Sequence, residues 1–163
     1  MTGRVVVVGV GNPFRRDDGA GLAVIRALRA TPPPHVVLAE SDGEPGRMLD
    51  LWNGDDFVVV ADAVHAHPSC PGRLHTLSAQ NTAEIAKRPA SSHALGLGET
   101  FALAAALGRM PREVTVCAVE GCDFGLGRGL SAPVTAALPG LIAMVVESVG
   151  RAHADLAGPG PPR

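Results

Sequence analysis

The sequence is poor in aromatic residues and contains no tyrosine. Its 163 residues include one Trp and four Phe, and the formal net charge at pH 7 is −2. Proteins that bind nucleic acid need a basic surface, and those that bind single strands add aromatic side chains on which bases stack. The Lys and Arg residues of this chain are scattered rather than clustered. These absences argue against nucleic acid as a partner.

Cysteine is scarce as well. Cys70, Cys117 and Cys122 are odd in number and form no Cys-x-x-Cys pair. A disulfide framework uses paired cysteines, and a thiolate zinc site needs closely spaced pairs. We therefore expect buried free thiols.

A signal peptide and a membrane span are both missing from the pattern. The chain enters a strand-like run at once, and its longest late apolar run, residues 141–146, ends at Glu147. That run is far shorter than the roughly 20 residues of a membrane helix. We expect a cytoplasmic protein that does not contact the membrane.

What the chain does contain is a regular alternation of strand and helix patterns. Strands are predicted at 5–8, 35–40, 57–61, 72–77 and 113–120, and helices at 22–28, 45–52, 91–107 and 132–155. The alternation predicts an α/β fold, with a mainly parallel twisted sheet of about five strands and helices on both faces. Strand 72–77 alternates in polarity, which favours an antiparallel edge strand. We expect one domain, residues 1–156, and a disordered Gly- and Pro-rich tail, 157–163.

The loop at residues 9–21 joins the first strand to the first helix. Gly9 and Gly11 are compatible with a dinucleotide loop, where glycines let the backbone approach a pyrophosphate. Asp17 and Asp18 would oppose a phosphate by like charge, so a cation suits the loop better. Both aspartates could serve only as helix caps. One cap, worth about 1 kcal/mol, needs one aspartate, and its neighbour is then free to face the crevice.

Two further acids follow strands. Asp62 comes after the apolar run 57–61 and is predicted to end that strand, while Asp42 follows the second strand. The first and third strands of a doubly wound sheet lie close together, so Asp62 and the first-loop acids are expected to share one crevice. Carboxylates gathered there repel each other unless a cation joins them. A plain turn role is the simpler alternative for Asp62.

His93 is the histidine best placed for metal binding. It follows two serines at the start of a predicted helix, where the helix dipole disfavours the charged imidazolium. The neutral imidazole that remains is the form that binds metals. His65 and His67 lie in a Pro- and Gly-rich turn and His75 lies on the edge strand, so we expect these three at the surface.

The end of the chain is predicted to hold a mobile loop and a long helix. Residues 121–129 are rich in glycine, and Ser131 is expected to cap the last helix. Pro133 suits the first turn of that helix, and Pro139 predicts a kink.

Three sequence elements together carry a family resemblance. They are Gly-x-Gly-Asn-x-x-x-x-Asp-Asp-Gly-x-Gly on the first loop, Val-Val-Val-Ala-Asp-Ala around Asp62, and Ser-Ser-His ending at His93. Over residues 5–149 the sequence resembles the nickel-iron hydrogenase maturation proteases. Those enzymes remove a short C-terminal extension from the hydrogenase large subunit after nickel insertion. The resemblance implies a monomeric hydrolase, an aspartic-type endopeptidase, whose partner is the large-subunit precursor.

The resemblance also implies a site. Asp18, Asp62 and His93 correspond to the family's metal ligands, which act in catalysis through the metal. Asp42 corresponds to a substrate-facing acid, although the Gly-Glu-Pro-Gly that follows departs from the family's Gly-Gly-Thr. The implied metal is nickel, delivered by the substrate, with zinc or cadmium as possible substitutes. Two carboxylates and one imidazole suit a first-row transition metal better than calcium or magnesium.

No nucleophile with a matched base is apparent in the sequence. Two other function classes therefore stay open. The same three ligands would serve a non-catalytic chaperone that checks the metal of the large subunit, which cleavage of a precursor would exclude. A dinucleotide-binding module is the second alternative, testable by titrating nucleotides against the fluorescence of Trp52.

Overall fold

The computed structural model describes residues 3–78 and 92–159, with the backbone alone for residues 78 and 92–96. Within this part of the chain, five strands pair into one sheet in the order β2-β1-β3-β5-β4. Their bounds are Val5–Val10 for β1, Val36–Ser41 for β2, Phe57–Val64 for β3, Leu74–Ser78 for β4 and Glu113–Glu120 for β5. The first four strands of this order run parallel, and β4 pairs antiparallel with β5 at the edge. The predicted α/β class and the antiparallel edge strand are both confirmed.

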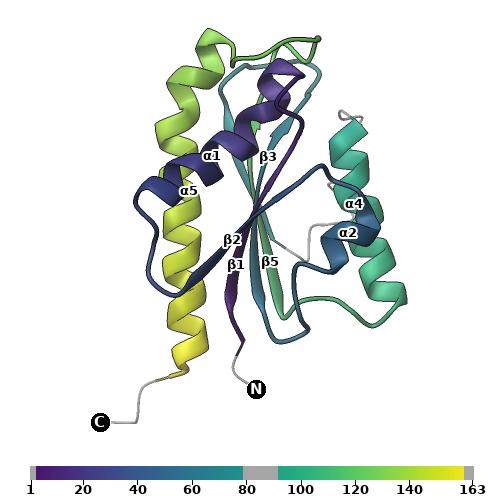
Figure 1. Ribbon diagram of the computed structural model, residues 1–163, viewed down its shortest axis with the longest axis vertical. Coiled ribbons are helices and arrows are strands. Elements are labelled where there is room, and N and C mark those ends of the chain that lie inside the picture. The colour runs from purple at the N-terminus through teal and green to yellow at the C-terminus, as the bar shows by residue number, and fades with distance from the viewer. Residues whose placement is uncertain (1–2, 79–91, 160–163) are drawn as a thin grey trace.

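Helices cover both faces of the sheet, as predicted. Figure 1 shows α1 and α5 on one side and α2 and α4 on the other. The helix bounds are Ala20–Ala30 for α1, Pro45–Leu49 for α2, Ser92–Ala106 for α4 and Ala132–Ala157 for α5, and a short 3-10 helix, η1, spans Arg16–Gly19.

Strand β1 shows why the sheet lies at the centre of the domain. All six of its residues are buried, which a strand with helices on both faces requires. Val5 and Val7 belong to the core beneath α1 and α5, and Val6 and Val8 to the core beneath α2 and α4. The alternation of a β-strand thus divides the apolar side chains between two cores.

Helix α5 is 26 residues long, and an 18-residue window of it has a mean hydropathy of 1.6, enough by length and composition to cross a membrane. The structure gives it another role. Its residues Val134, Leu141, Val145 and Val149 are buried in the core that α5 shares with α1 and the sheet. Pro133 lies in its first turn and Pro139 lies inside it. One face of α5 therefore packs in this core, and 28% of its most apolar 18-residue window is buried.

Two elements differ in extent from the prediction. Strand β3 continues through Asp62 to Val64, because β5 pairs with it along its whole length, up to Val64 opposite Glu120. Helix α2 ends at Leu49 rather than near residue 52. Trp52 nevertheless remains buried, stacked 6.1 Å from Phe101 of α4.

The amino edge of the sheet is held by a buried acid that the sequence did not single out. Asp56 is 2% exposed and accepts hydrogen bonds from the backbone amides of Arg4 and Asn53, each at 2.8 Å. The Arg4 guanidinium lies 2.6 Å from the second carboxylate oxygen. Burial alone would raise the pKa of Asp56, but these hydrogen bonds and the Arg4 charge outweigh it and lower the pKa. Asp56 therefore fastens the start of β1 to the turn before β3.

Candidate functional site

The glycines of the first loop allow α1 to pack directly on the sheet. A Cβ atom on Gly21 would lie 2.3 Å from the carbonyl oxygen of Ala61 in β3 and 2.6 Å from that of Val10. A Cβ on Gly9 would lie 2.4 Å from the Gly21 carbonyl oxygen. These distances are too short for any side chain. The glycines thus have a packing role that needs no bound phosphate.

Asp18 lies in η1, at the carboxyl edge of the sheet, and is fully buried. Its Oδ2 accepts a hydrogen bond of 2.9 Å from the backbone amide of Asn12. Helix η1 packs against β3, and the Asp18 backbone lies against Gly11, just after β1.

Asp62 is also fully buried, but it does not end its strand as predicted. It lies inside β3, opposite Ala118 of β5, and its Oδ1 accepts the amide of Ala63 at 2.8 Å. Pairing between β1 and β3 stops at Ala61, so Asp62 is the first residue of β3 beyond it. Strand alternation places Asp62 on the same face as Val60, which belongs to the core beneath α2 and α4.

His93 lies in the first turn of α4, the helix on that same face. The residues after α4 lead to Glu113, which pairs with Phe57 at the amino edge, so α4 begins at the opposite edge, where β1 and β3 end (Figure 1). The backbone of His93 is thus at the edge that holds Asp18 and Asp62. Its side chain lies outside the described residues, and convergence of the three ligands stays a prediction. Among the side chains that are described, none form a group of three or more His, Cys, Asp or Glu able to hold a metal.

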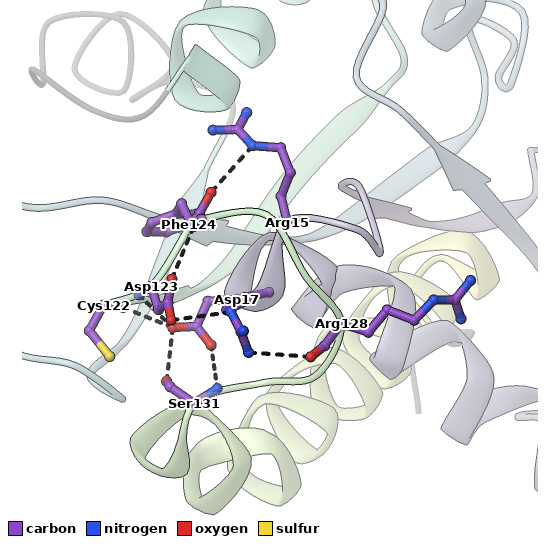
Figure 2. Close-up of polar contacts among 9 residues, drawn as sticks. Arg15, Asp17, Cys122, Asp123, Phe124, Arg128 and Ser131 are labelled. Atoms are coloured by element: carbon purple, nitrogen blue, oxygen red, sulfur yellow. Dashed lines mark hydrogen bonds and ion pairs between the residues drawn. The ribbon is translucent and has the colours of Figure 1, made fainter.

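Asp17 does not cap a helix, contrary to one of our expectations. The cap positions of η1 and α1 belong to Arg15 and Gly19, and neither makes a capping hydrogen bond through a side chain. Figure 2 shows the buried carboxylate of Asp17 directed instead at the loop between β5 and α5. It accepts four hydrogen bonds there, from the amides of Cys122 at 2.9 Å, Asp123 at 3.0 Å and Ser131 at 2.7 Å, and from the Ser131 hydroxyl at 2.8 Å.

These four hydrogen bonds favour the ionised form of the Asp17 carboxylate. Burial would raise its pKa, but the hydrogen bonds from the loop more than compensate, and the pKa is lowered. Ser131 stands at the N-cap position of α5 and makes no capping hydrogen bond with its side chain, while its hydroxyl donates to Asp17. The serine predicted to cap α5 thus binds the first loop.

Further contacts join the same two loops. The amide of Arg16 donates to the Gly127 carbonyl at 3.0 Å, and the amide of Gly127 donates to the Phe14 carbonyl at 2.8 Å. The Arg16 guanidinium lies 3.5 Å from the Asp123 carboxylate. The glycine-rich loop that we expected to be mobile is thus tied to the segment that carries Asp18.

Asp42 is exposed just after β2 and borders a groove of about 660 Å³ that also reaches Gly11 and Pro13 of the first loop. Its carboxylate accepts the Glu44 amide at 3.1 Å and forms an ion pair with Arg47. The hydrogen bond from the Glu44 amide and the charge and hydrogen bond of Arg47 together lower the pKa of Asp42. Asp42 thus lies beside the first loop, and its contact with substrate stays a prediction.

Glu44 explains why the chain departs from the family pattern after Asp42. It is the N-cap of α2, and its carboxylate accepts the amides of Gly46 at 2.9 Å and Arg47 at 2.7 Å. Pro45 fills the first position of that helix, where its missing N–H costs nothing. The Glu-Pro-Gly sequence therefore starts a helix.

Three histidines that we set aside have partners other than the two buried aspartates. His65 stacks on Phe124, with ring centroids 5.3 Å apart, and His67 lies 4.6 Å from His65. His75, predicted to be exposed, is instead three-quarters buried, with Nε2 2.8 Å from a carboxylate oxygen of Glu120.

Glu120 is a buried acid that the sequence analysis overlooked. Burial raises its pKa, but the hydrogen bonds from His75 and from the Cys70 amide prevail and lower it. A signal was present, because an acid at the end of one strand can meet a diagonal histidine on an antiparallel neighbour, and His75 pairs with Ala118, two residues before Glu120.

The cysteines also depart from expectation. Cys117 is buried in β5, where burial raises the pKa of its thiol, but Cys70 and Cys122 are exposed. The two exposed thiols lie in loops that follow β3 and β5. All three are free, as predicted.

Comparisons with known proteins agree with this architecture. The family model for hydrogenase maturation protease matches residues 23–148. The hydrogenase 2 maturation protease of Escherichia coli is 26% identical over 151 residues, covering 89% of this chain and 92% of that protein. The solved [NiFe] hydrogenase maturation protease HybD of Thermococcus kodakarensis has a TM-score of 0.76 at 26% identity, covering 88% of this chain and 97% of that one. The maturating endopeptidase HybD of E. coli has a TM-score of 0.79 at 23% identity, covering 91% and 93%.

These findings define the class of the protein as a processing endopeptidase, a hydrolase of peptide bonds. The chain belongs to the hydrogenase maturation protease family. Membership favours the protease over the two alternatives that the sequence left open, the metal-checking chaperone and the dinucleotide-binding module.

Proposed function

We propose that this protein removes the C-terminal extension from a nickel-loaded precursor of a hydrogenase large subunit, acting as a monomer in the cytoplasm. The observation that carries the proposal is the carboxyl edge of the sheet. Two fully buried carboxylates, Asp18 and Asp62, lie there on packed elements, and the helix that bears His93 begins at the same edge. Family membership supplies the reaction class.

The donor set fits nickel. Two carboxylate oxygens and one imidazole nitrogen suit a first-row transition metal, and nickel stands above iron in the general order of affinity. Asp18, Asp62 and His93 would hold the nickel of the precursor as part of the substrate, with zinc or cadmium as possible substitutes. A bound divalent ion supplies positive charge, which serves for recognition and can also polarise a carbonyl.

The residues of the chain itself prepare this edge. The Asn12 amide orients the Asp18 carboxylate, and the contacts of Asp17 fix the backbone one residue earlier. Positions fixed before substrate arrives cost little free energy at binding. Asp42 lies on the groove beside the first loop, where it would contact the precursor chain.

The test is incubation of the purified protein with large-subunit precursors, loaded with nickel or free of it, followed by intact-mass measurement. We expect a mass loss equal to the extension with the loaded precursor only. Asp18→Asn, Asp62→Asn and His93→Gln should abolish that loss and keep the far-ultraviolet circular dichroism of the parent. Asp155→Asn, which changes an exposed acid on α5, is the matched control and should process normally.

Two results would contradict the proposal. One is cleavage at the parent's rate by Asp18→Asn or His93→Gln. The other is cleavage that does not depend on nickel.

A further inference from the structure

Two large apolar side chains are exposed on the loops beside the candidate site. Leu126, on the loop between β5 and α5, is 87% exposed, and Phe14, on the first loop, is 53% exposed. The two loops are adjacent, since the Gly127 amide donates to the Phe14 carbonyl at 2.8 Å and Arg15 forms a β-bridge with Gly127. We call Phe14, Arg15, Leu126 and Arg128 together the Phe14–Leu126 surface.

The backbone beneath this surface is held in place. Asp17 accepts four hydrogen bonds from the loop of Leu126, and the amides of Arg16 and Asp17 donate back to the carbonyls of Gly127 and Asp123. Figure 2 shows the Asp17 carboxylate joined to Cys122, Asp123 and Ser131 of that loop. Side chains on a fixed backbone lose less entropy on binding than those on a flexible loop. A leucine exposed on such a support is suited to insert into a partner's pocket.

The surface is also locally basic, although the whole chain has a net charge of −2. The Arg128 guanidinium lies 4.5 Å from the centroid of the Phe14 ring, and the Arg15 Nε donates to the Phe124 carbonyl. The nearby acid Asp123 forms its ion pair with Arg16. It therefore does not neutralise the charges of Arg15 and Arg128. The charge favours an acidic partner segment.

The position of the surface relative to the site is fixed by the chain. Phe14 and Arg15 precede Asp18 by four and three residues on one loop. The same hydrogen bonds that present Leu126 also immobilise the residue next to Asp18. A macromolecule bound on this surface would therefore lie beside the candidate metal ligands.

We propose that the Phe14–Leu126 surface docks the hydrogenase precursor, through an apolar segment of the precursor that is flanked by acidic residues and is distinct from the cleavage site. This inference rests on the proposed function. It adds a second contact, made by the protein surface, to recognition of the nickel centre. Docking here would lower KM without taking part in the cleavage step.

The experiment compares Leu126→Asp with Leu107→Asp, which changes a leucine that is 56% exposed at the far end of α4. Neither side chain supports the core, so both variants should fold. We expect Leu126→Asp to raise KM for the loaded precursor about tenfold or more with kcat nearly unchanged. Leu107→Asp should match the parent. Arg128→Glu should weaken binding most at low salt, because charge attraction is screened as salt increases.

Each outcome separates the possibilities. If Asp18→Asn abolishes cleavage but Leu126→Asp leaves KM unchanged, the docking proposal fails and the proposed function stands. If the parent processes no loaded precursor, the proposed function fails, and with it the partner assigned here. Two other binding partners are possible for this surface, a second copy of the chain and a lipid membrane. Sedimentation of the parent alone tests the first, and sedimentation with anionic vesicles tests the second. Self-association or vesicle binding that Leu126→Asp abolishes would overturn the docking proposal.

Discussion

Adjacent residues in one short helix have different tasks. Asp17 and Asp18 are both fully buried in η1, yet Asp17 accepts four hydrogen bonds from a distant loop, whereas Asp18 accepts the amide of nearby Asn12. Asp17 joins two segments of the chain, and Asp18 is oriented within its own loop. Substitution should separate these roles.

We expect Asp17→Asn to lower the free energy of unfolding by about 3 kcal/mol, because a carboxamide nitrogen would face donors and hydrogen bonds to a charged acceptor would be lost. A capping aspartate would have cost at most about 1 kcal/mol, since Asn caps about as well as Asp. Urea unfolding measures the difference. Asp18→Asn is the control and should stay within about 1 kcal/mol of the parent, because its remaining carbonyl oxygen can still accept from Asn12. An Asp17→Asn variant as stable as the parent would show that the loop does not depend on this carboxylate.

Asp56 predicts how stability depends on pH at the acid end. Its pKa is lower in the folded protein than the value of about 3.9 typical of an unfolded chain, despite burial, because of Arg4 and the Asn53 amide. Its contribution to stability is therefore complete above that unfolded value and is lost as the pH falls through the folded one. The parent should lose more unfolding free energy between about pH 5 and pH 2.5 than Asp56→Asn does. Denaturant titrations at several pH values give the unfolding free energy of both proteins as a function of pH. Equal slopes for the parent and Asp56→Asn would refute the role given to Asp56.

At this scale the sequence predicted the site only in part. Asp18 and Asp62 are both buried, and Asp62 lies just beyond the pairing of β1 with β3, but the shared crevice stays a prediction. The partners of Asp17 could not be predicted, since they lie more than a hundred residues away along the chain. The pairing of His75 with Glu120, 45 residues apart, was missed because the register between β4 and β5 was not predicted. Local patterns carry no information on which loops touch.

Among the elements, the approach of α1 to β1 and β3 is the most sensitive to substitution. We expect Gly21→Ala to destabilise the protein by about 3 kcal/mol or more, because the new Cβ would meet two backbone carbonyls that cannot move independently of the sheet. Gly150 in α5 is the matched control, since a Cβ there has no neighbour within 4 Å. Gly150→Ala should raise stability by about 0.5–1 kcal/mol through helix propensity. Thermal unfolding of both variants measures the contrast, and equal effects would contradict it.

Element types were predicted better than element ends. The apolar runs of β1, β3 and β5 predicted buried parallel strands, because strands covered on both faces need no polar alternation. The extension of β3 past Asp62 was missed, since an aspartate inside a strand is uncommon and the pairing with β5 that continues the strand there is not visible in the local pattern. The fold class depends on the repeating pattern, whereas each boundary depends on a neighbour.

For the whole molecule, the two cores should unfold together, because they share the five strands of one sheet. Trp52 reports on the core of α2 and α4, where it is 3% exposed and its Nε1 donates to the Arg109 carbonyl at 3.0 Å. Leu141 belongs to the opposite core. Leu141→Ala should shift the midpoint seen by Trp52 fluorescence as much as that seen by circular dichroism, at a cost of about 2–5 kcal/mol. Separate transitions would show two units in place of the single domain we expect over residues 1–156.

The bond between Asp17 and the loop after β5 also has a consequence for how this protein can evolve. Asp17 and Cys122 are 105 residues apart in the chain, yet a substitution that removes the Asp17 carboxylate or shifts the Cys122 backbone would weaken the hydrogen bond between them. Residues 14–17 and 121–131 should therefore be inherited as a unit, with substitutions in one segment matched by substitutions in the other. A chimaera that takes the second segment alone from a distant relative would lose stability, and one that takes both would regain it.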